Sequence, residues 1–514
     1  MRRSPVKLAH MAPAQNILFI TADQWRGDCL SALAHPVVQT PHLDAFAREG
    51  VMFTRHFANT APCSPSRATL HTGLYQHNHR VAMNGTPLDR RHTNWAIESR
   101  KRGYDPALIG YTDQTPDPRD LSPNDPRLNT YEGLLPGITA IAHTGMEHPG
   151  PWGDFLKAKG YDLPTDERFV LWMREGGPDY EEGAAHPRPF AIRAEHNDTT
   201  WHVDQAIDYV SGRRSEPWLL HLSLLRPHPP WIASEPWNRR YDPESLPPPQ
   251  RRENFDLEGE QHPFLAFQLA RGISRSPRNL KKLNRLRAVY FAMISEVDEN
   301  LGRLFAHLKR ERLWDSTLVI FTSDHGEELG DHWLLGKGGY FDASYRVPCI
   351  ISDPRPAADV TRGARVHAFT EHVDIMPTIL EAIGARAPRQ CDGRSLTPFM
   401  NTGKVASWRS EAHWEFDFRD ASDDAAERAL GLTLDECNLS VIRSERYKYV
   451  HFANLPPLFF DLQSDPHEFR NLVDDPAFAP LVLAHAQKLI SWRLAHEDRT
   501  LTHMMATADG LVTR

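Results

Sequence analysis

Four short hydrophobic stretches, far apart in the chain, each lead into polar or titratable residues. They are residues 16–22, 107–113, 218–225 and 318–323. Their length and their content of β-branched residues are typical of buried strands. Ligands of open parallel sheets bind beyond the carboxyl ends of the strands. We therefore expect the polar residues that end these stretches to converge on one site.

Helical periodicity links the third and fourth stretches. Apolar residues recur at intervals of three and four between residues 286 and 308, which predicts a long amphipathic helix. A helix in that position supplies the crossover that parallel strands require. A shorter helix over residues 41–50, ending at Gly50, follows the first stretch.

The pattern changes toward the C-terminus. Short strand-like runs at residues 439–443, 447–452 and 458–462 are separated by turn-like residues, as in an antiparallel sheet. Residues 479–494 have the periodicity of an amphipathic helix that packs on it. We therefore expect an α/β fold with a large mixed, mostly parallel sheet flanked by helices, and a smaller C-terminal subdomain of antiparallel sheet plus helix.

Composition and charge narrow the classes of partner. The 514 residues carry a net charge of -8, which argues against a nucleic-acid or anionic-membrane partner. The 41 prolines indicate long, shaped loops. Residues 114–200 and 234–280, rich in Pro, Gly and charge, are expected to be long excursions from the sheet that shape specificity.

The cysteines and the N-terminus indicate a compartment. Five scattered cysteines do not suggest a disulfide framework and favour a reducing environment. The first residues never build the apolar core of a signal peptide, and no run reaches transmembrane length. We therefore expect a cytoplasmic protein.

A compact motif begins at Cys63 and continues through Pro65 and Arg67 to Thr72 and Gly73. A helix that starts near Pro65 returns Arg67, one turn on, to the face of residue 63. Its N-terminus also favours an anion. Two other interpretations are an inert buried cysteine and a thiolate phosphatase, whose loop has five residues between Cys and Arg where this chain has three.

Three residues at the ends of the predicted strands suit a divalent cation. Asp23, Asp324 and His325 offer hard or intermediate ligands. An Asp at a strand end is, by itself, often only a helix cap. The occurrence of all three together with the Cys63 motif favours a metal site.

The Cys63 motif resembles the signature of the type I sulfatase family, in the alkaline phosphatase superfamily. In that family the cysteine is converted to formylglycine, whose aldehyde hydrate is the nucleophile. Many sulfatases carry two adjacent acids after the first strand and Asp-Asn after the later one, whereas this chain has Asp23-Gln24 and Asp324-His325. One acidic ligand is therefore missing.

That variation is similar to the bacterial phosphonate monoester hydrolase (phosphodiesterase) branch of the superfamily. Further matches to this branch lie at residues 226–230, 335–337, 415–420 and 457–462. The resemblance runs from about residue 16 to the C-terminus. It implies an alkaline phosphatase-like fold.

The resemblance also implies a metal site and a modified residue. Asp23, residue 63, Asp324 and His325 would hold one divalent ion, which is Mn, Ca or Zn. Residue 63 would be formylglycine derived from Cys63, so a formylglycine-generating maturation enzyme is an expected partner.

The remaining roles concern the substrate. By resemblance, Arg67 supports the aldehyde hydrate, and Asn84, Tyr111, His228 and Lys337 surround the transferred group. His228 or Lys337 protonates or screens the departing oxygen. The alternatives are a loop histidine held by prolines for His228 and a solvated loop cation for Lys337.

Asp113 departs from the pattern, because this branch is expected to have a hydroxyl residue there. It belongs with the candidate substrate-binding residues Asn84 and Tyr111. An added carboxylate could repel the anion or could bind the metal. The consequence for substrate preference is open.

These expectations combine into one function. The chain is expected to be a formylglycine- and metal-dependent hydrolase of phosphonate monoesters and phosphodiesters, promiscuous toward sulfate monoesters, that acts through a covalent hemiacetal ester. An alternative is an arylsulfatase of the same superfamily, and a more remote one is a non-catalytic relative that binds an anion. The substrate would be a small anionic ester.

We predict four segments and an oligomer. By resemblance to the same branch, the oligomer is expected to be a homotetramer or a dimer, formed through the tail. The segments are a flexible leader at residues 1–14, a catalytic α/β domain at 15–385, a C-terminal α+β subdomain at 386–495, and a tail at 496–514.

Overall fold

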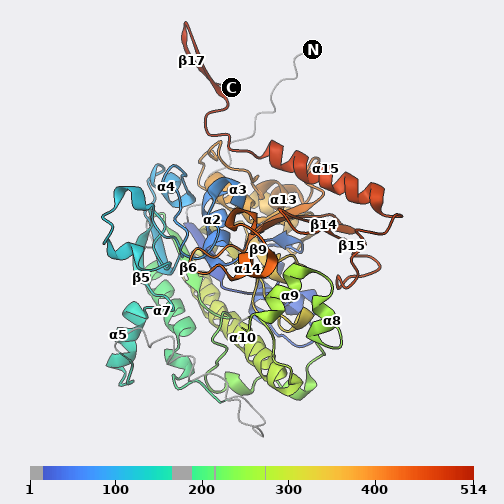
Figure 1. Ribbon diagram of the computed structural model, residues 1–514. Helices are drawn as coiled ribbons and strands as arrows, with labels where there is room; N and C mark the ends of the chain where they lie inside the picture. Colours follow the sequence, from blue (N-terminus) through green and yellow to red (C-terminus); the bar gives the residue numbers. More distant parts are fainter. Residues whose placement is uncertain (1–15, 165–187, 214–215, 273, 514) are drawn as a thin grey trace.

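The computed structural model describes residues 16–164, 188–213, 216–272 and 274–513. These residues form an eight-stranded sheet covered by helices and a separate four-stranded sheet (Figure 1). The predicted leader at residues 1–14 lies outside the described residues.

The four predicted strands lie side by side in the large sheet. Its strand order is β10-β2-β9-β7-β1-β6-β4-β5. β1 (Asn16–Ala22) pairs in parallel with β6 (Leu219–Leu224) and β7 (Thr317–Thr322), and β4 (Pro106–Gly110) pairs in parallel with β6. β9 (Cys349–Ser352) runs antiparallel to β7. The mixed, mostly parallel sheet is confirmed.

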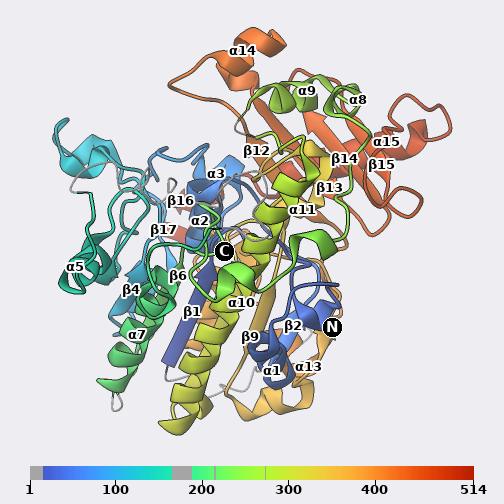
Figure 2. The ribbon, with the colours of Figure 1, turned by 90° about the horizontal axis from the view of Figure 1, so that it is seen from below.

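Helices cover both faces of this sheet, so its central strands are buried throughout. Leu18 and Ile20 of β1 pack in one cluster with α1 (Pro41–Glu49), α7 (Asp198–Ser211) and α10, which lie across the face seen in Figure 2. Ile17 and Phe19, on the alternate face, pack with α2 (Cys63–Thr72), α4 (Trp95–Arg100) and α12 (Ile375–Ala382). The side-chain alternation of a strand thus divides the core into two layers.

The crossover helix α10 (Leu280–Arg310) is confirmed and begins before its apolar stretch. The side chain of Asn279 accepts hydrogen bonds from the backbone of Lys281 and Lys282, which caps the first turn. Pro41 stands at the start of α1, where a missing N–H has no cost.

The C-terminal sheet is antiparallel, as predicted, and has one more strand than the sequence indicated. β13 (Asn438–Arg443), β14 (Tyr447–Phe452) and β15 (Leu458–Asp461) match the three predicted runs, and β12 (Ala412–Asp417) pairs with β13. α15 (Ala479–Ala495) packs on this sheet through Leu489 and Trp492. The predicted domain limits at residues 385 and 495 stay predictions.

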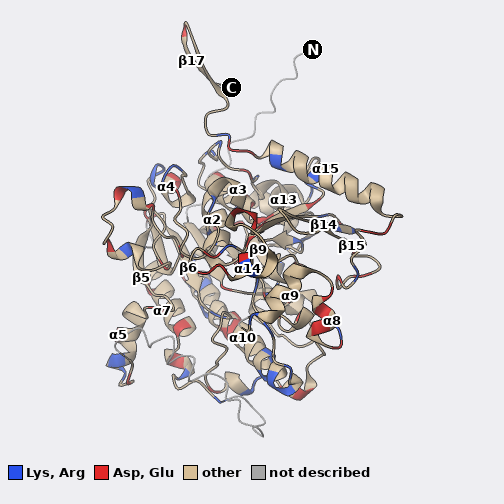
Figure 3. Ribbon diagram, in the orientation of Figure 1, with Lys and Arg blue, Asp and Glu red and all other residues tan. Residues whose placement is uncertain are grey.

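The tail forms a two-stranded hairpin of β16 (Met504–Thr507) and β17 (Gly510–Thr513). Figure 1 shows it projecting from the body of the molecule beyond α15. Figure 3 shows Lys and Arg and Asp and Glu scattered over helices and loops, with both signs along α10. Among the described helices, none has the length and apolar character needed to cross a bilayer.

The remaining elements are short. They are β2 (Val51–Phe53), β3 (His56–Phe57), α2 (Cys63–Thr72), α3 (Gln76–His79), α4 (Trp95–Arg100), β5 (Thr139–His143), α5 (Gly150–Ala158), α8 (Phe255–Gly259), α9 (Pro263–Ala270), α11 (Asp342–Tyr345), β8 (Arg346–Val347), β10 (Arg365–Val366), β11 (Thr370–Glu371), α12 (Ile375–Ala382), α13 (Thr397–Thr402) and α14 (Ala425–Leu430).

Candidate active site

The cysteine motif forms α2, which begins at Cys63, close to the start near Pro65 that the sequence suggested. Every residue of this helix is buried. The backbone N–H of Ser64 donates to Oδ1 of Asn84 at 2.9 Å, so Asn84 ties down the first turn. Pro65 lies within that turn, where its missing N–H needs no partner. Residue 63 therefore stands at the N-terminal end of a rigid helix.

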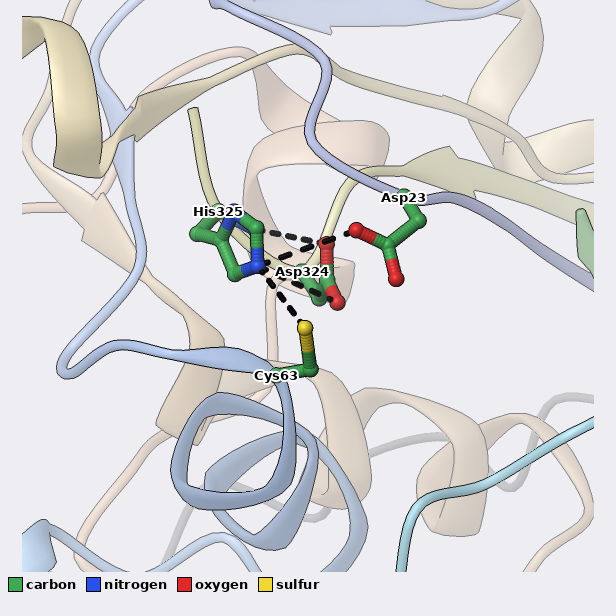
Figure 4. Close-up of side chains that lie close together, drawn as sticks. All are labelled: Asp23, Cys63, Asp324 and His325. Atoms are coloured by element: carbon green, nitrogen blue, oxygen red, sulfur yellow. Dashed lines mark hydrogen bonds and ion pairs between the residues drawn. The ribbon is translucent and has the colours of Figure 1, made fainter. Parts of the chain in front are cut away.

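Four of the predicted residues come together at this end (Figure 4). Asp23 follows β1, Asp324 and His325 follow the adjacent β7, and Cys63 comes from α2. One ligand atom from each lies within 4.8 Å of the others, and all four residues are buried. Their predicted roles as metal ligands remain proposals.

Some ligand atoms of the cluster make no hydrogen bond to described residues outside it, so they point toward one another. Nδ1 of His325 lies 3.2 Å from the carbonyl oxygen of Gly326, so this nitrogen carries the proton and Nε2 keeps its lone pair. Nε2 lies 3.3 Å from Sγ of Cys63. Burial and the charge of Lys337 lower the pKa of His325 well below its usual range. Oδ1 of Asp23 is buried and has no hydrogen-bond partner among the described residues.

Arg67 ties the ends of three strands together. Its Nη2 donates to Asp23 at 3.0 Å and its Nε to Asp324 at 3.1 Å. Its Nη1 donates at 2.9 Å to Oγ of Ser223, near the end of β6. The guanidinium is fully buried and also lies 4.3 Å from the centre of the Tyr111 ring. Its predicted support of the group at residue 63 stays a prediction.

Tyr111 and Asp113, which follow β4, complete this buried network. The hydroxyl of Tyr111 donates to Oδ2 of Asp23 at 2.6 Å. Oδ2 of Asp113 lies 3.4 Å from Nε of Arg67, and Asp113 is not part of the four-residue cluster. Burial raises the pKa of Asp113 well above its usual range, although Arg67 opposes this. The geometry therefore favours a role for Asp113 in the net charge of the site and not as a metal ligand.

His228 and Lys337 form a pair on the other side of the cluster. Nζ of Lys337 lies 3.3 Å from Nε2 of His228, whose Nδ1 lies 2.6 Å from the carbonyl oxygen of Pro229. Burial and the charge of Lys337 lower the pKa of His228 to about 4. Burial opposes the charge of Lys337, but the nearby acidic side chains of Asp23 and Asp324 outweigh burial and raise the pKa of the ammonium. The pair is thus a neutral imidazole beside an ammonium group.

Two buried residues that the sequence reasoning did not select join this pair. Oε1 of Gln24 accepts a hydrogen bond from Nζ of Lys337 at 2.6 Å, and its Nε2 donates to the carboxylate of Glu327. Gln24 adopts a left-handed backbone with φ of 64°, an uncommon conformation that is often found at functional sites. The sequence did contain a signal for these two residues, which is their position next to predicted metal ligands. Gln24 follows Asp23, and Glu327 lies two residues beyond His325.

A cavity of about 690 Å³ opens over His228 and Lys337. Segments that the sequence identified as excursions contribute to its wall, with Met146 from the first and Phe267 and Arg271 from the second. Its remaining lining is mainly aromatic, aliphatic and proline side chains with a few charges. Among these are Pro62, Met83, Pro229, Trp231, Leu335, Phe416, Asp417, Phe418, Arg419 and Asp420.

Comparisons with known proteins agree with this architecture. A family model described as sulfatase matches residues 15–385, and one described as N-sulphoglucosamine sulphohydrolase, C-terminal, matches residues 330–495. The chain is 45% identical over 519 residues to the multifunctional alkaline phosphatase superfamily protein PehA of Trinickia caryophylli, which covers 97% of this chain and 99% of that protein.

Two solved structures are also similar over nearly their full length. The phosphonate monoester hydrolase of Agrobacterium radiobacter has a TM-score of 0.90 and 45% identity, covering 98% of this chain and 100% of that one. The phosphonate monoester hydrolase of Silicibacter pomeroyi has a TM-score of 0.90 and 38% identity, covering 97% and 99%.

Proposed function

This chain belongs to the sulfatase family, and from that premise we propose that it hydrolyses phosphonate monoesters and phosphodiesters, with activity toward sulfate monoesters. The observation that carries the proposal is the cluster of Asp23, Cys63, Asp324 and His325. It occurs in a chain that is similar over almost its whole length to two phosphonate monoester hydrolases.

The cluster fits a divalent cation. The unpartnered Oδ1 of Asp23 and the lone pair on Nε2 of His325 face the same space as the carboxylate of Asp324. Together with an oxygen at residue 63, they form a set of hard and intermediate ligands that suits Mn, Ca or Zn. When bound, such a cation supplies Lewis acidity and lowers the pKa of a coordinated hydroxyl.

We propose that Cys63 is converted to formylglycine. Burial, with Asp23 next, raises the pKa of its thiol well above the usual range, so the unconverted side chain is a neutral thiol and a poor nucleophile. Formylglycine instead supplies a hydrate with one hydroxyl to attack and a second to release the product. The helix N-terminus, anchored by Asn84, holds residue 63 toward the anion.

On the opposite side, Lys337 stabilises the departing oxygen. It is charged, it lines the cavity, and it lies next to His228. Neutral His228 accepts from the ammonium through Nε2, because its Nδ1 is occupied by the carbonyl of Pro229. The negative charge that develops on the leaving oxygen therefore meets a preorganised N–H donor.

The charge of the site favours singly charged esters. The buried carboxylates of Asp23 and Asp324 are matched by the cations Arg67 and Lys337. A divalent cation adds two positive charges, and the attacking oxygen at residue 63 carries one negative charge once it loses its proton, so the site keeps one positive charge, which a monoanion balances. Phosphonate monoesters, phosphodiesters and sulfate monoesters each present one negative charge, whereas a phosphate monoester presents two.

The cavity favours an apolar organic group on the substrate. Met83, Trp231, Phe267 and Phe416 line the space above Lys337. Aromatic and thioether side chains bind apolar and aromatic groups with little desolvation cost. We propose that this space takes the leaving group, because Lys337 and His228 lie at its base.

Two measurements test the function. The first is the mass of the proteolytic peptide that spans residue 63, where we expect the mass of an aldehyde or its hydrate in place of a thiol. The second compares kcat/KM for 4-nitrophenyl phenylphosphonate and 4-nitrophenyl sulfate with metal added, and we expect the phosphonate to be the better substrate.

The outcomes separate the alternatives. A higher kcat/KM for the sulfate would identify an arylsulfatase. A fully converted residue 63 with no turnover of either ester would identify a non-catalytic anion-binding relative. An intact thiol, from a host known to mature such cysteines, would remove the nucleophile from the mechanism.

We also propose a cellular setting. The five cysteines, all within the described residues, are free thiols, which supports a reducing compartment such as the cytoplasm. A maturation enzyme in that compartment would convert Cys63. The projecting hairpin carries exposed Met505 and Leu511, and Leu501 just before it is exposed as well. These apolar side chains support a homo-oligomer, a tetramer or a dimer, that buries them.

A further inference from the structure

Glu327 is a fully buried carboxylate behind the active site, and it does not line the cavity. Its Oε1 accepts hydrogen bonds from the backbone N–H of Leu329 at 2.9 Å and of Gly336 at 2.7 Å. Its Oε2 accepts from the side-chain amide of Gln24. Three N–H groups, from two separate loops, thus converge on one carboxylate.

This arrangement determines the direction of the Gln24 amide. A carboxylate is an acceptor, so Gln24 must present its NH₂ to Glu327 and its carbonyl oxygen to the other side. On that side Nζ of Lys337, which is only a donor, lies 2.6 Å from Oε1 of Gln24. The polarity of the two neighbours therefore assigns the orientation of the amide.

The same carboxylate also holds the loop that carries Lys337. It accepts the hydrogen bond from the N–H of Gly336, the residue immediately before Lys337. Lys337 has three N–H donors. One is directed to Gln24 and a second lies near Nε2 of His228, at 3.3 Å, which leaves the third for a ligand in the cavity.

We propose that Glu327 is a positioning residue that aims the ammonium of Lys337 at the departing oxygen, through the Gln24 amide and the Gly336 N–H. The inference rests on the proposed function, since it assigns how the leaving group is stabilised. If the Gln24 amide is reversed, its NH₂ faces the ammonium, and Lys337 moves away from its place beside His228. The resulting loss in kcat/KM is larger for a more basic leaving group.

The substitution Glu327→Gln tests this with little change in volume. The carbonyl of the new amide stays with the two backbone N–H groups, since turning it away would lose two hydrogen bonds. The new NH₂ then faces Gln24 and reverses it. The measurement is the ratio of kcat/KM for phenyl phenylphosphonate to kcat/KM for 4-nitrophenyl phenylphosphonate.

We expect this ratio to fall by about tenfold in the Glu327→Gln variant, because the phenolate leaving group needs the donor more than nitrophenolate does. The ratio is taken within one sample, so it does not depend on the fraction of protein that is folded or converted at residue 63. A variant of low stability can therefore still be tested.

A swap of the two residues supplies the decisive variant. In Gln24→Glu/Glu327→Gln the amide at 327 donates to the carboxylate at 24, whose second oxygen again accepts from Lys337. We expect its ratio to return to within about threefold of wild type, while Gln24→Glu alone lowers the ratio because two carboxylates then face each other.

The neighbouring Glu328 is a matched control. It is equally buried and its carboxylate accepts from Ser344, with no contact to Gln24. We expect Glu328→Gln to keep the wild-type ratio.

An unchanged ratio in Glu327→Gln, or a swap variant with a ratio as low as that of either single variant, would overturn the assignment. Turnover of both esters by the wild type tests the proposed function separately. If the wild type turned over neither ester, the proposed function would be wrong. If only the role of Glu327 were wrong, the wild type would turn over both esters and the Glu327→Gln variant would keep the wild-type ratio.

Discussion

Asp113 illustrates how one buried residue can tune the charge of a site. Its carboxylate lies 3.4 Å from Nε of Arg67, which already pairs with Asp23 and Asp324. The donors of this guanidinium are already engaged by Asp23, Asp324 and Ser223. A third negative charge there would weaken the attraction for an anionic ester, so the protonation of Asp113 matters for activity.

The pH dependence has a definite sign. Because burial raises the pKa of Asp113, the group is neutral at low pH and becomes charged as the pH rises through that pKa. We expect kcat/KM for a phosphonate monoester to fall by about tenfold as the pH rises through that pKa, which gives the pH profile a descending limb. In Asp113→Asn the limb is expected to be lost. A pH profile of both proteins is the measurement, and an identical limb in the variant would contradict the assignment.

At the scale of elements, the close approach of β4 and β6 positions residues at the carboxyl ends of the two strands. Gly110 ends β4 with φ of +110°, and a Cβ there would lie 2.0 Å from the carbonyl oxygen of Ser223. Ser223 in turn accepts from Arg67. The absence of a side chain at Gly110 thus allows Tyr111 and Ser223 to reach the same guanidinium.

Gly110→Ala should separate these two strand ends. We expect destabilisation of at least about 3 kcal/mol in urea unfolding, because backbone must shift in addition to the strained φ. The matched control is Gly103→Ala, where φ is +86° but nothing lies within 4 Å of the new Cβ. Its expected cost is about 1–2 kcal/mol, from the left-handed conformation alone. Equal losses in the two variants would show that the close approach has no energetic role.

At the scale of the whole molecule, the substrate cavity is a composite. Phe416 and Phe418 come from β12 and the residue just after it, and Phe267 comes from α9. Phe264 of α9 packs in one cluster with Trp414 and Phe418, so the excursion is held against the C-terminal sheet. Substrate preference therefore depends on how that sheet packs on the catalytic residues.

The projecting hairpin gives the prediction for assembly. A chain that stops after Arg499 keeps the ion pair between Arg499 and Asp392 and loses exposed Leu501, Met505 and Leu511. In sedimentation velocity we expect the full chain to be an oligomer and the shortened chain to be smaller, with kcat/KM for a phosphonate monoester changed by less than about threefold. A full-length monomer would reject the proposal.

Much of this architecture could be predicted from local sequence. The four buried strands were visible because each is a short apolar stretch, and α10 because its periodicity runs over many turns. Asp23, Asp324 and His325 were found because a strand end places the next residue at the edge of the sheet. By contrast, β12 was missed, since its sequence mixes His, Glu and Asp with apolar residues.

The sequence by itself determined the strands, the crossover helix, the cysteine motif and the residues that converge at its side, because these depend on periodicity and on the direction of parallel strands. Only the tertiary structure decided that α2 begins at Cys63, that Asp113 lies beside Arg67, and that Gln24 connects Glu327 to Lys337. Those relations join residues distant in the chain, and the direction of a hydrogen bond between them depends on the partners that folding supplies.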